Sequence, residues 1–178
     1  MTDHMYPDGK WEYRAETRRW NPFVRTPQGG RVLSALKLPF FLLRTPHGYG
    51  VLVTTGAKTG RARRKCIRAI VDGDRTYLVS IGGGYAAWVK NIRHDPRVRL
   101  RLGRKWFDGV AAELSDPAEL AAARDMYCRT VVPFDYPTCR VHRRGMPSRD
   151  KIVELTTAWL EGGIPVVIRL DRQRQRHS

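Results

Sequence analysis

The middle of the chain alternates between apolar and polar positions, which is the pattern of half-buried strands. The segment 97–102 alternates strictly, with Val98, Leu100 and Leu102 on one face and three arginines on the other. Similar patterns predict strands at 49–55, 61–71, 75–81, 105–114 and 165–170. In 61–71 we expect Ile67, Ala69 and Val71 to share one face. The Asp72-Gly73-Asp74 sequence is typical of a hairpin turn between two of these strands.

Four segments have helical patterns. An amphipathic helix is expected over 31–44, broken at Leu38 by Pro39. A short helix is expected over 86–94. Asp116-Pro117 supplies an N-cap and a first helical residue for a helix ending near residue 130. A last helix is expected over 147–161, closed by two glycines. The segment 131–147 has no clear period and is expected to be irregular.

Strands that pair with their sequence neighbours favour an antiparallel sheet over a βαβ nucleotide-binding fold. We therefore expect an α+β protein that is mainly β, an antiparallel barrel of about six strands with flanking helices. The chain has 178 residues, which is the size of one domain. Residues 1–30 are expected to form an N-terminal arm, residues 31–178 a single barrel domain, and residues 171–178 a basic tail.

The charge balance narrows the classes of partner. Lysine and arginine total 33 against 17 acidic residues, which gives a net charge of +16. Such a field attracts nucleic acid, an anionic membrane surface or an acidic small molecule, and charge alone does not choose among them. The chain has three cysteines without CxxC spacing and no apolar run long enough to span a bilayer, so we expect a cytoplasmic protein.

The most informative motif is YGVLVTTGAKTGRARR, at residues 49–64. An apolar strand enters a glycine-bracketed turn, and an arginine-rich strand leaves it. The turn brings together backbone N–H groups, a hydroxyl and cations, which are the groups that hold phosphate or carboxylate. It is not a P-loop, because a strand rather than a helix follows. The candidate anion ligands are Lys58, Thr59, Gly60, Arg61, Arg63 and Arg64. The alternative is a solvated hairpin tip.

A second motif joins the end of a predicted strand to a short helix. Ser80 is followed closely by three glycines, Gly82, Gly83 and Gly84, which let backbone approach a ligand. In the helix that follows, Trp88 and Asn91 are three residues apart and share a face, so both are further candidate contacts of the bound ligand. The alternative interpretation is a flexible loop followed by a tryptophan of the core.

Taken in order, these motifs resemble the deazaflavin-dependent nitroreductase family. The resemblance rests on VLVTTGAKTGRARR, the DGD turn, Ser80 with its glycine loop, WVKNI at 88–92 and DPRV at 95–98, and it resumes at Ile164. The family consists of actinobacterial split β-barrel proteins that bind coenzyme F420. The resemblance thus implies a split β-barrel and an oxidoreductase that uses this deazaflavin.

The resemblance also implies roles for individual residues. Lys58, Thr59, Gly60 and Arg63 fall where the family grips the phosphate and the oligoglutamate tail of the coenzyme. Cys66 falls where the second strand lines the deazaflavin, Ser80 and the glycines lie beside the ring, and Trp88 closes the pocket. The chain departs from the family at Ala57, where an arginine or lysine is common, and residues 131–161 match nothing in it.

Hydride transfer from a reduced deazaflavin needs an aligned acceptor and a proton source, and no metal. The five histidines lack the spacing of metal ligands. As proton source we rank Ser80 first and Tyr136 second. Tyr127 and His142 are further candidates for contact with the substrate, although Tyr127 has the position of a core residue in its helix.

The leading hypothesis is a reductase that moves hydride from reduced coenzyme F420 to an enone, quinone or nitro compound. The alternative is a split-barrel protein that binds FMN or a lipid-like molecule. A nucleic-acid-binding protein is a remote third option, supported only by charge and the arginine face of 97–102. Peripheral association with an anionic membrane through residues 31–45 and a homodimer are possible additions to any of these hypotheses.

Overall fold

The computed structural model describes residues 27–81 and 83–171, so most of the expected arm and of the basic tail lies outside the described residues, and residues 27–30 of the expected arm belong to a helix. The helices are α2 (Pro27–Leu43), α3 (Ala87–His94), α4 (Pro117–Arg129), α5 (Asp135–His142) and α6 (Arg149–Gly162), with a short 3-10 turn, η2 (Gly83–Tyr85). The strands are β1 (Tyr49–Thr55), β2 (Ala62–Arg68), β3 (Ile70–Asp72), β4 (Arg75–Ser80), β5 (Arg97–Leu102), β6 (Lys105–Glu113) and β7 (Ile164–Asp171).

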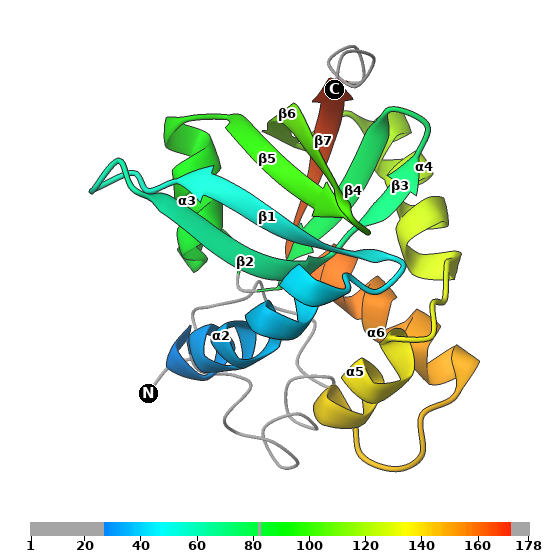
Figure 1. Ribbon diagram of the computed structural model, residues 1–178. Helices are drawn as coiled ribbons and strands as arrows, with labels where there is room; N and C mark the ends of the chain where they lie inside the picture. Colours follow the sequence, from blue (N-terminus) through cyan, green and yellow to red (C-terminus); the bar gives the residue numbers. More distant parts are fainter. Residues whose placement is uncertain (1–26, 82, 172–178) are drawn as a thin grey trace, which may run out of the picture.

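Seven strands form one sheet in the order β2-β1-β5-β6-β7-β4-β3, and every neighbouring pair is antiparallel. The strands at the two ends of this order, β2 and β3, are consecutive in the chain and are separated only by Ala69. The sheet must therefore curl until its ends meet, and Figure 1 shows the resulting barrel. The expected α+β split-barrel class is confirmed, with seven strands instead of about six.

The extra strand arises at Ala69, where the expected strand 61–71 bends. The N–H of Ala69 leaves the sheet ladder and donates to the Gly48 carbonyl at 2.8 Å. This bend also overturns the expected alternation, because Val71 is exposed while Arg68 is buried. The β2–β3 segment thus crosses from one layer of the protein to another. Its alternate side chains therefore do not all lie on one face of the sheet.

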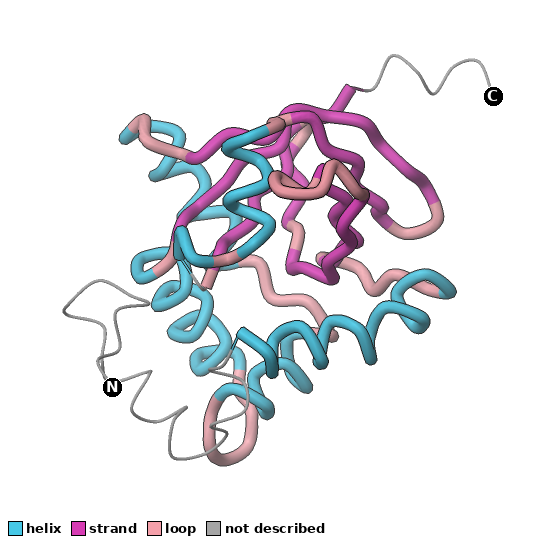
Figure 2. Tube along the Cα trace, turned by 90° about the vertical axis from the view of Figure 1, so that its left-hand side faces the viewer, coloured by secondary structure: helices cyan, strands magenta, loops and turns pink. Residues whose placement is uncertain are grey.

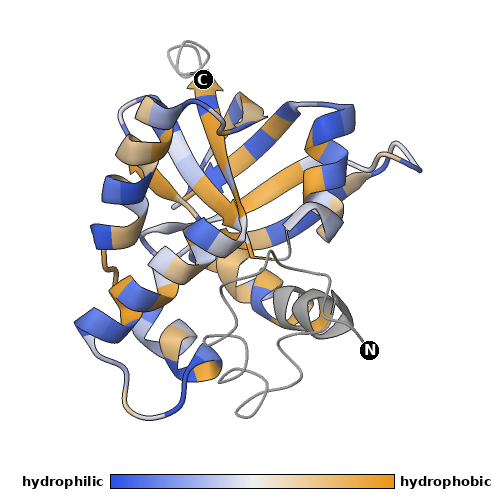
Figure 3. Cartoon of the chain, turned by 180° about the vertical axis from the view of Figure 1, so that it is seen from behind, coloured by the Kyte–Doolittle hydropathy of each residue, from blue (hydrophilic) through white to orange (hydrophobic). Residues whose placement is uncertain are grey.

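Apolar side chains pack in three groups. The barrel interior contains Leu52, Ile67, Leu100 and Val166, and is closed at one end by Trp88 and its neighbours in α3. A second group lies between the sheet and helices α4 and α6, and a third lies between α2 and the outer face of β1. Figure 2 shows several helices gathered below the strands, and Figure 3 shows that the strands of the sheet are rich in apolar residues.

Apart from the bend at Ala69, the predicted elements are largely confirmed, with two further exceptions. The expected break at Leu38 is wrong, because α2 continues through Pro39 to Leu43. Phe41, one turn further on, is 1% exposed against Tyr49 and Val51, and this packing offsets the local cost of a proline, roughly 3 kcal/mol. The second exception is α5, which lies in the segment expected to be irregular.

The expected N-cap at Asp116 is confirmed, and a second N-cap occurs at Ser148. Asp116 accepts from the Glu119 N–H and caps α4, and Ser148 accepts from the Lys151 N–H and caps α6. None of the three cysteines forms a disulfide bond. Among the residues that the structure describes, none of the helices combines the length and the apolar character that crossing a bilayer requires.

Candidate functional site

The turn between β1 and β2 is a closed, hydrogen-bonded loop. The Gly56 N–H donates to the Arg61 carbonyl at 2.9 Å, and the Gly56 carbonyl accepts from the N–H groups of Thr59 and Gly60 at 3.1 and 2.7 Å. Gly60 has φ of 64°, a left-handed conformation that glycine adopts without strain. The turn projects from the side of the barrel (Figure 1), and these internal hydrogen bonds close it.

Helix α3 holds this turn through Asn91. The side-chain Nδ2 of Asn91 donates to Thr54 Oγ1 at 2.8 Å, and its Oδ1 accepts from the Ala57 N–H at 3.0 Å. Asn91 is 7% exposed. The Asn91 amide therefore hydrogen-bonds within the protein. Asn91 was expected to contact the ligand, and in the structure it positions the turn.

The cations of the turn lack acidic partners. Among the described residues no carboxylate pairs with them, although many other arginines form ion pairs. The Arg63 Nη2 group instead donates to Thr59 Oγ1 at 3.4 Å. Exposed, unpaired cations at a rigid turn form a site of positive potential. They are Lys58, Arg61, Arg63 and Arg64.

The second motif is more deeply buried than its sequence suggests. Ser80 is 1% exposed, and its hydroxyl donates to the Gly83 carbonyl at 2.9 Å. Gly83 has φ of 56° and Gly84 lies beside Arg93, whereas Gly82 lies outside the described residues. The Trp88 side chain is 5% exposed and belongs to the barrel interior. This position agrees with the alternative interpretation of Trp88 as a residue of the core.

The aromatic candidates for substrate contact occupy different environments. Tyr127 is 1% exposed under the Arg68 guanidinium, and burial raises the pKa of its phenol to about 12. Tyr136 is 40% exposed on α5. His142, at the end of the same helix, packs edge-on against Trp159 with ring centroids 5.0 Å apart, and burial lowers the pKa of its imidazole to about 3. Tyr136 is the most exposed of the three.

The sequence reasoning missed a buried ion pair. The Arg68 guanidinium donates Nε to Asp135 Oδ1 at 2.9 Å and Nη2 to Oδ2 at 3.0 Å, with both side chains 3% exposed. Tyr49 also donates to Asp135 Oδ1, at 2.8 Å. The pair joins the barrel to α5, the helix that carries Tyr136. The available signal was an arginine inside an otherwise apolar run, from Ile67 to Ile70.

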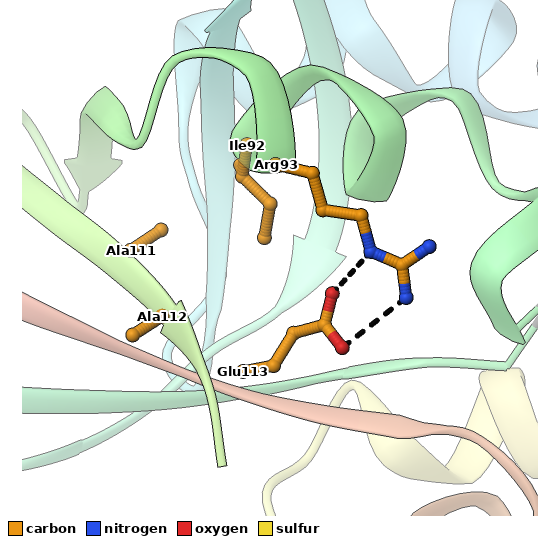
Figure 4. Close-up of a pocket in the computed structure, with 5 residues that line it drawn as sticks. All are labelled: Ile92, Arg93, Ala111, Ala112 and Glu113. Carbon is orange, nitrogen blue, oxygen red and sulfur yellow. Dashed lines mark hydrogen bonds and ion pairs between the residues drawn. The ribbon is translucent and has the colours of Figure 1, made fainter.

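A depression of about 240 Å³ lies elsewhere, between α3 and β6. Figure 4 shows its lining, in which Arg93 and Glu113 point toward each other across it and form two hydrogen bonds of 2.5 and 3.2 Å. Ile92, Ala111 and Ala112 complete the wall. None of the expected ligand or catalytic residues lines this depression, so we do not identify it with the site. Among the described residues, no cluster of three or more His, Cys, Asp or Glu side chains is placed to hold a metal ion.

F420H(2)-dependent quinone reductases of Mycobacterium tuberculosis are 35% identical to the chain over 77 residues, which is 42% of this chain and 51% of the relative. The match thus spans about half the length of these curated relatives.

Solved structures of similar fold include an F420-H2 dependent reductase, with 20% identity over 70% of this chain and 94% of that one and a TM-score of 0.44. Another is the heme storage protein of Vibrio cholerae, with 13% identity over 77% of this chain and 89% of that one and a TM-score of 0.45.

The family model described as F420H(2)-dependent quinone reductase matches residues 19–147, a range that includes β1, the cationic turn, the glycine loop and α5. The chain therefore belongs to the F420H(2)-dependent quinone reductase family.

Proposed function

We propose that the protein transfers hydride from reduced coenzyme F420 to a small organic acceptor, such as a quinone, an enone or a nitro compound. One observation carries this proposal: Lys58, Arg61, Arg63 and Arg64 surround one rigid turn with no carboxylate partner among the described residues. Membership in the quinone reductase family supports the same assignment.

The turn fits the acidic part of the coenzyme. Coenzyme F420 carries a phosphodiester and several carboxylates, and a hydrogen bond between charged groups contributes roughly 1.5–3 kcal/mol. Lys58, Thr59, Gly60, Arg63 and Arg64 would hold this tail. Since the turn is already closed by its own hydrogen bonds, little ordering is needed when the tail binds.

The remaining expected contacts lie around the ring of the coenzyme. We propose that Cys66 and the glycine loop after Ser80 line it, while Tyr136 contacts the acceptor from α5. When bound, the reduced coenzyme supplies the hydride. The task of the chain is to align the acceptor, exclude water and provide a proton.

A double variant, Lys58→Ala with Arg63→Ala, tests the tail site. Loss of two charge-assisted bonds should weaken coenzyme binding by roughly 100-fold, measured by deazaflavin fluorescence. Arg104→Ala with Lys105→Ala is the matched control, because these exposed cations lie at another hairpin turn, between β5 and β6. Equal affinity of the test variant and the control would contradict the tail site.

The same titration separates the alternatives. A purified protein with bound flavin absorbance and no response to coenzyme F420 would favour FMN. Nucleic-acid binding has less support in the structure, because two arginines of the expected basic face are ion-paired, Arg97 with Asp95 and Arg99 with Asp108. Binding to DNA that survives physiological salt would restore that hypothesis.

We also propose that α2 contacts an anionic membrane surface. Four apolar side chains of this helix are exposed at helical spacing: Val32 (45%), Leu36 (73%), Phe40 (51%) and Leu43 (78%). Co-sedimentation with vesicles that contain anionic lipid should be lost in Leu36→Ser with Phe40→Ser, and retained in Val110→Ser, an exposed apolar residue of β6. Ultracentrifugation without vesicles tests the proposed homodimer.

A further inference from the structure

The side chains of β2 divide between the two faces of the sheet, and the strand register assigns each to its face. Lys65 pairs with Leu52, which packs inside the barrel, and Ile67 packs there as well. Cys66 pairs with Val51 and packs in the apolar group under α2. Because side chains alternate along a strand, the Lys65 side chain points to the barrel side and that of Cys66 to α2. Cys66 can therefore line a bound ring only through its backbone.

Lys65 lies between the cationic turn and the glycine loop. Arg63, two residues nearer the turn, pairs with Thr54 and shares the face of Lys65. The register of β3 with β4, continued past the bend into β2, sets Ile67 level with Ser80, where the glycine loop begins. Strands β2 and β4 are also in contact. A ligand that extends along this face from the turn to the glycine loop must therefore pass Lys65.

The Lys65 side chain is half-buried, and among the described residues no carboxylate or hydrogen-bond acceptor pairs with its ammonium group. Other polar groups of this region are already engaged. Thr54 accepts from the Asn91 amide, and Ser80 donates to the Gly83 carbonyl. Burial lowers the pKa of the Lys65 ammonium, because a cation taken out of water without a counter-ion is destabilised. An anionic group of a ligand would relieve this cost.

The position of Lys65 along β2 separates it from the groups that hold the acidic tail. Two residues of a strand span roughly 7 Å, so Lys65 lies about this far beyond Arg63. The five-carbon ribityl chain that joins the phosphate of coenzyme F420 to its ring can span this distance. With the phosphate at the turn, the ring system is therefore the part of the coenzyme that reaches Lys65.

We propose that Lys65 contacts the ring of the coenzyme and selects its ionised form. This inference rests on the proposed function, in which the turn holds the tail and the glycine loop lines the ring. The oxidised deazaflavin ring carries an acidic phenol, and the charge of its anion spreads over the conjugated system. An ammonium group beside the ring forms a charge-assisted hydrogen bond with this anion and tunes its electronic state. The oxidised ring of FMN is neutral at the same pH, so Lys65 would favour coenzyme F420 over FMN.

A comparison of two ligands separates the ring contact from the tail site. The ligands are coenzyme F420 and its ring fragment, the deazaflavin with its ribityl chain but without phosphate or glutamates. Lys65→Met should weaken the binding of both by roughly tenfold, followed by fluorescence, because one charged contact is lost. Lys58→Ala with Arg63→Ala should weaken binding of the coenzyme alone. Lys105→Met, at an exposed lysine of β6, is the control. Full affinity of Lys65→Met for both ligands would overturn the ring contact.

The absorbance of the bound oxidised coenzyme gives a second measurement, since the ionised and neutral rings absorb differently. In Lys65→Met the bound ring should titrate about one pH unit higher than in wild type, the equivalent of a tenfold weaker preference for the anion. Lys65→Arg should keep the wild-type titration, because arginine keeps the charge. A lysine that only supported the strand would leave the titration unchanged, and this result would refute the proposal.

Other charged groups near the ring are the same in wild type and in the Lys65 variants, so the difference in titration reports Lys65. They are Arg63 of β2, Lys37 of α2, Lys90 of α3 and the Arg93–Glu113 pair between α3 and β6.

Two controls separate this inference from folding and from the proposed function. The melting temperature of Lys65→Met should equal or exceed that of wild type, because the variant removes an unpaired, half-buried charge. A clearly lower melting temperature would mean that the ammonium has a partner within the protein, and would contradict the ring contact. A wild-type protein that binds FMN and not coenzyme F420 would refute the proposed function. A protein that binds coenzyme F420 equally well with and without Lys65, and with the same ring titration, would refute this inference alone.

Discussion

Asn91 donates its side-chain amide to Thr54 Oγ1 at 2.8 Å, and this contact ties helix α3 to the end of β1. The carbonyl oxygen of the same amide accepts from the Ala57 N–H at 3.0 Å, inside the cationic turn. Asn91, which lies 37 positions from Thr54 in sequence, therefore sets the position of the turn. Ligand affinity at the turn should depend on a side chain that touches no ligand.

Replacing Asn91 with leucine should loosen the turn. The change keeps the volume but leaves the Ala57 N–H and the Thr54 hydroxyl without their partner, at a cost of roughly 1–3 kcal/mol for each buried group. We expect faster amide hydrogen exchange at residues 57–61 and weaker binding of coenzyme F420. Lys90→Ala, on the exposed side of the same helix, is the control. Exchange in Asn91→Leu that matches this control would show that the turn holds its shape alone.

The ion pair between Arg68 and Asp135 should show strong coupling. Arg68→Met leaves the Asp135 carboxylate buried without its cation, and breaking a buried pair costs roughly 3–5 kcal/mol. Adding Asp135→Leu removes the stranded charge, so the double variant should be more stable than the sum of the two single changes predicts. Denaturant unfolding of the four proteins gives the coupling energy. Additive losses would mean that the two side chains act independently.

The unfolding free energy should decrease at mildly acidic pH because of His142. Its folded pKa of about 3 lies below the ordinary value of 6.5, so between these values the unfolded chain binds one more proton than the folded chain. Stability is therefore lost as pH falls through this window, by at most about 1.4 kcal/mol per pH unit. His142→Phe keeps a ring against Trp159 and should flatten the dependence relative to His94→Phe, a change at an exposed histidine. An unchanged slope would show that His142 is protonated in the folded state.

The strands could be predicted because their information is local. The bounds of β1 and β5 follow from short alternating runs between turns, and the cationic residues of the site are sequence neighbours. Helix α5 could not be predicted in this way, since it contains Pro137 and has little apolar periodicity of its own. It is held by Asp135 against Arg68, a contact 67 residues apart in sequence.

Ser80 offers the last prediction, because its expected role as proton source and its place in the structure disagree. Its hydroxyl hydrogen is engaged with the Gly83 carbonyl, and the side chain is 1% exposed. Ser80→Ala should therefore reduce stability by about 0.5–1.5 kcal/mol, the net value of one hydrogen bond, through the glycine loop. The dependence of turnover on pH should stay that of wild type. Thr76→Ala, which alters another buried hydroxyl of β4, is the control for stability. A Ser80→Ala variant with normal stability and coenzyme affinity but a shifted pH profile would restore Ser80 as the acid.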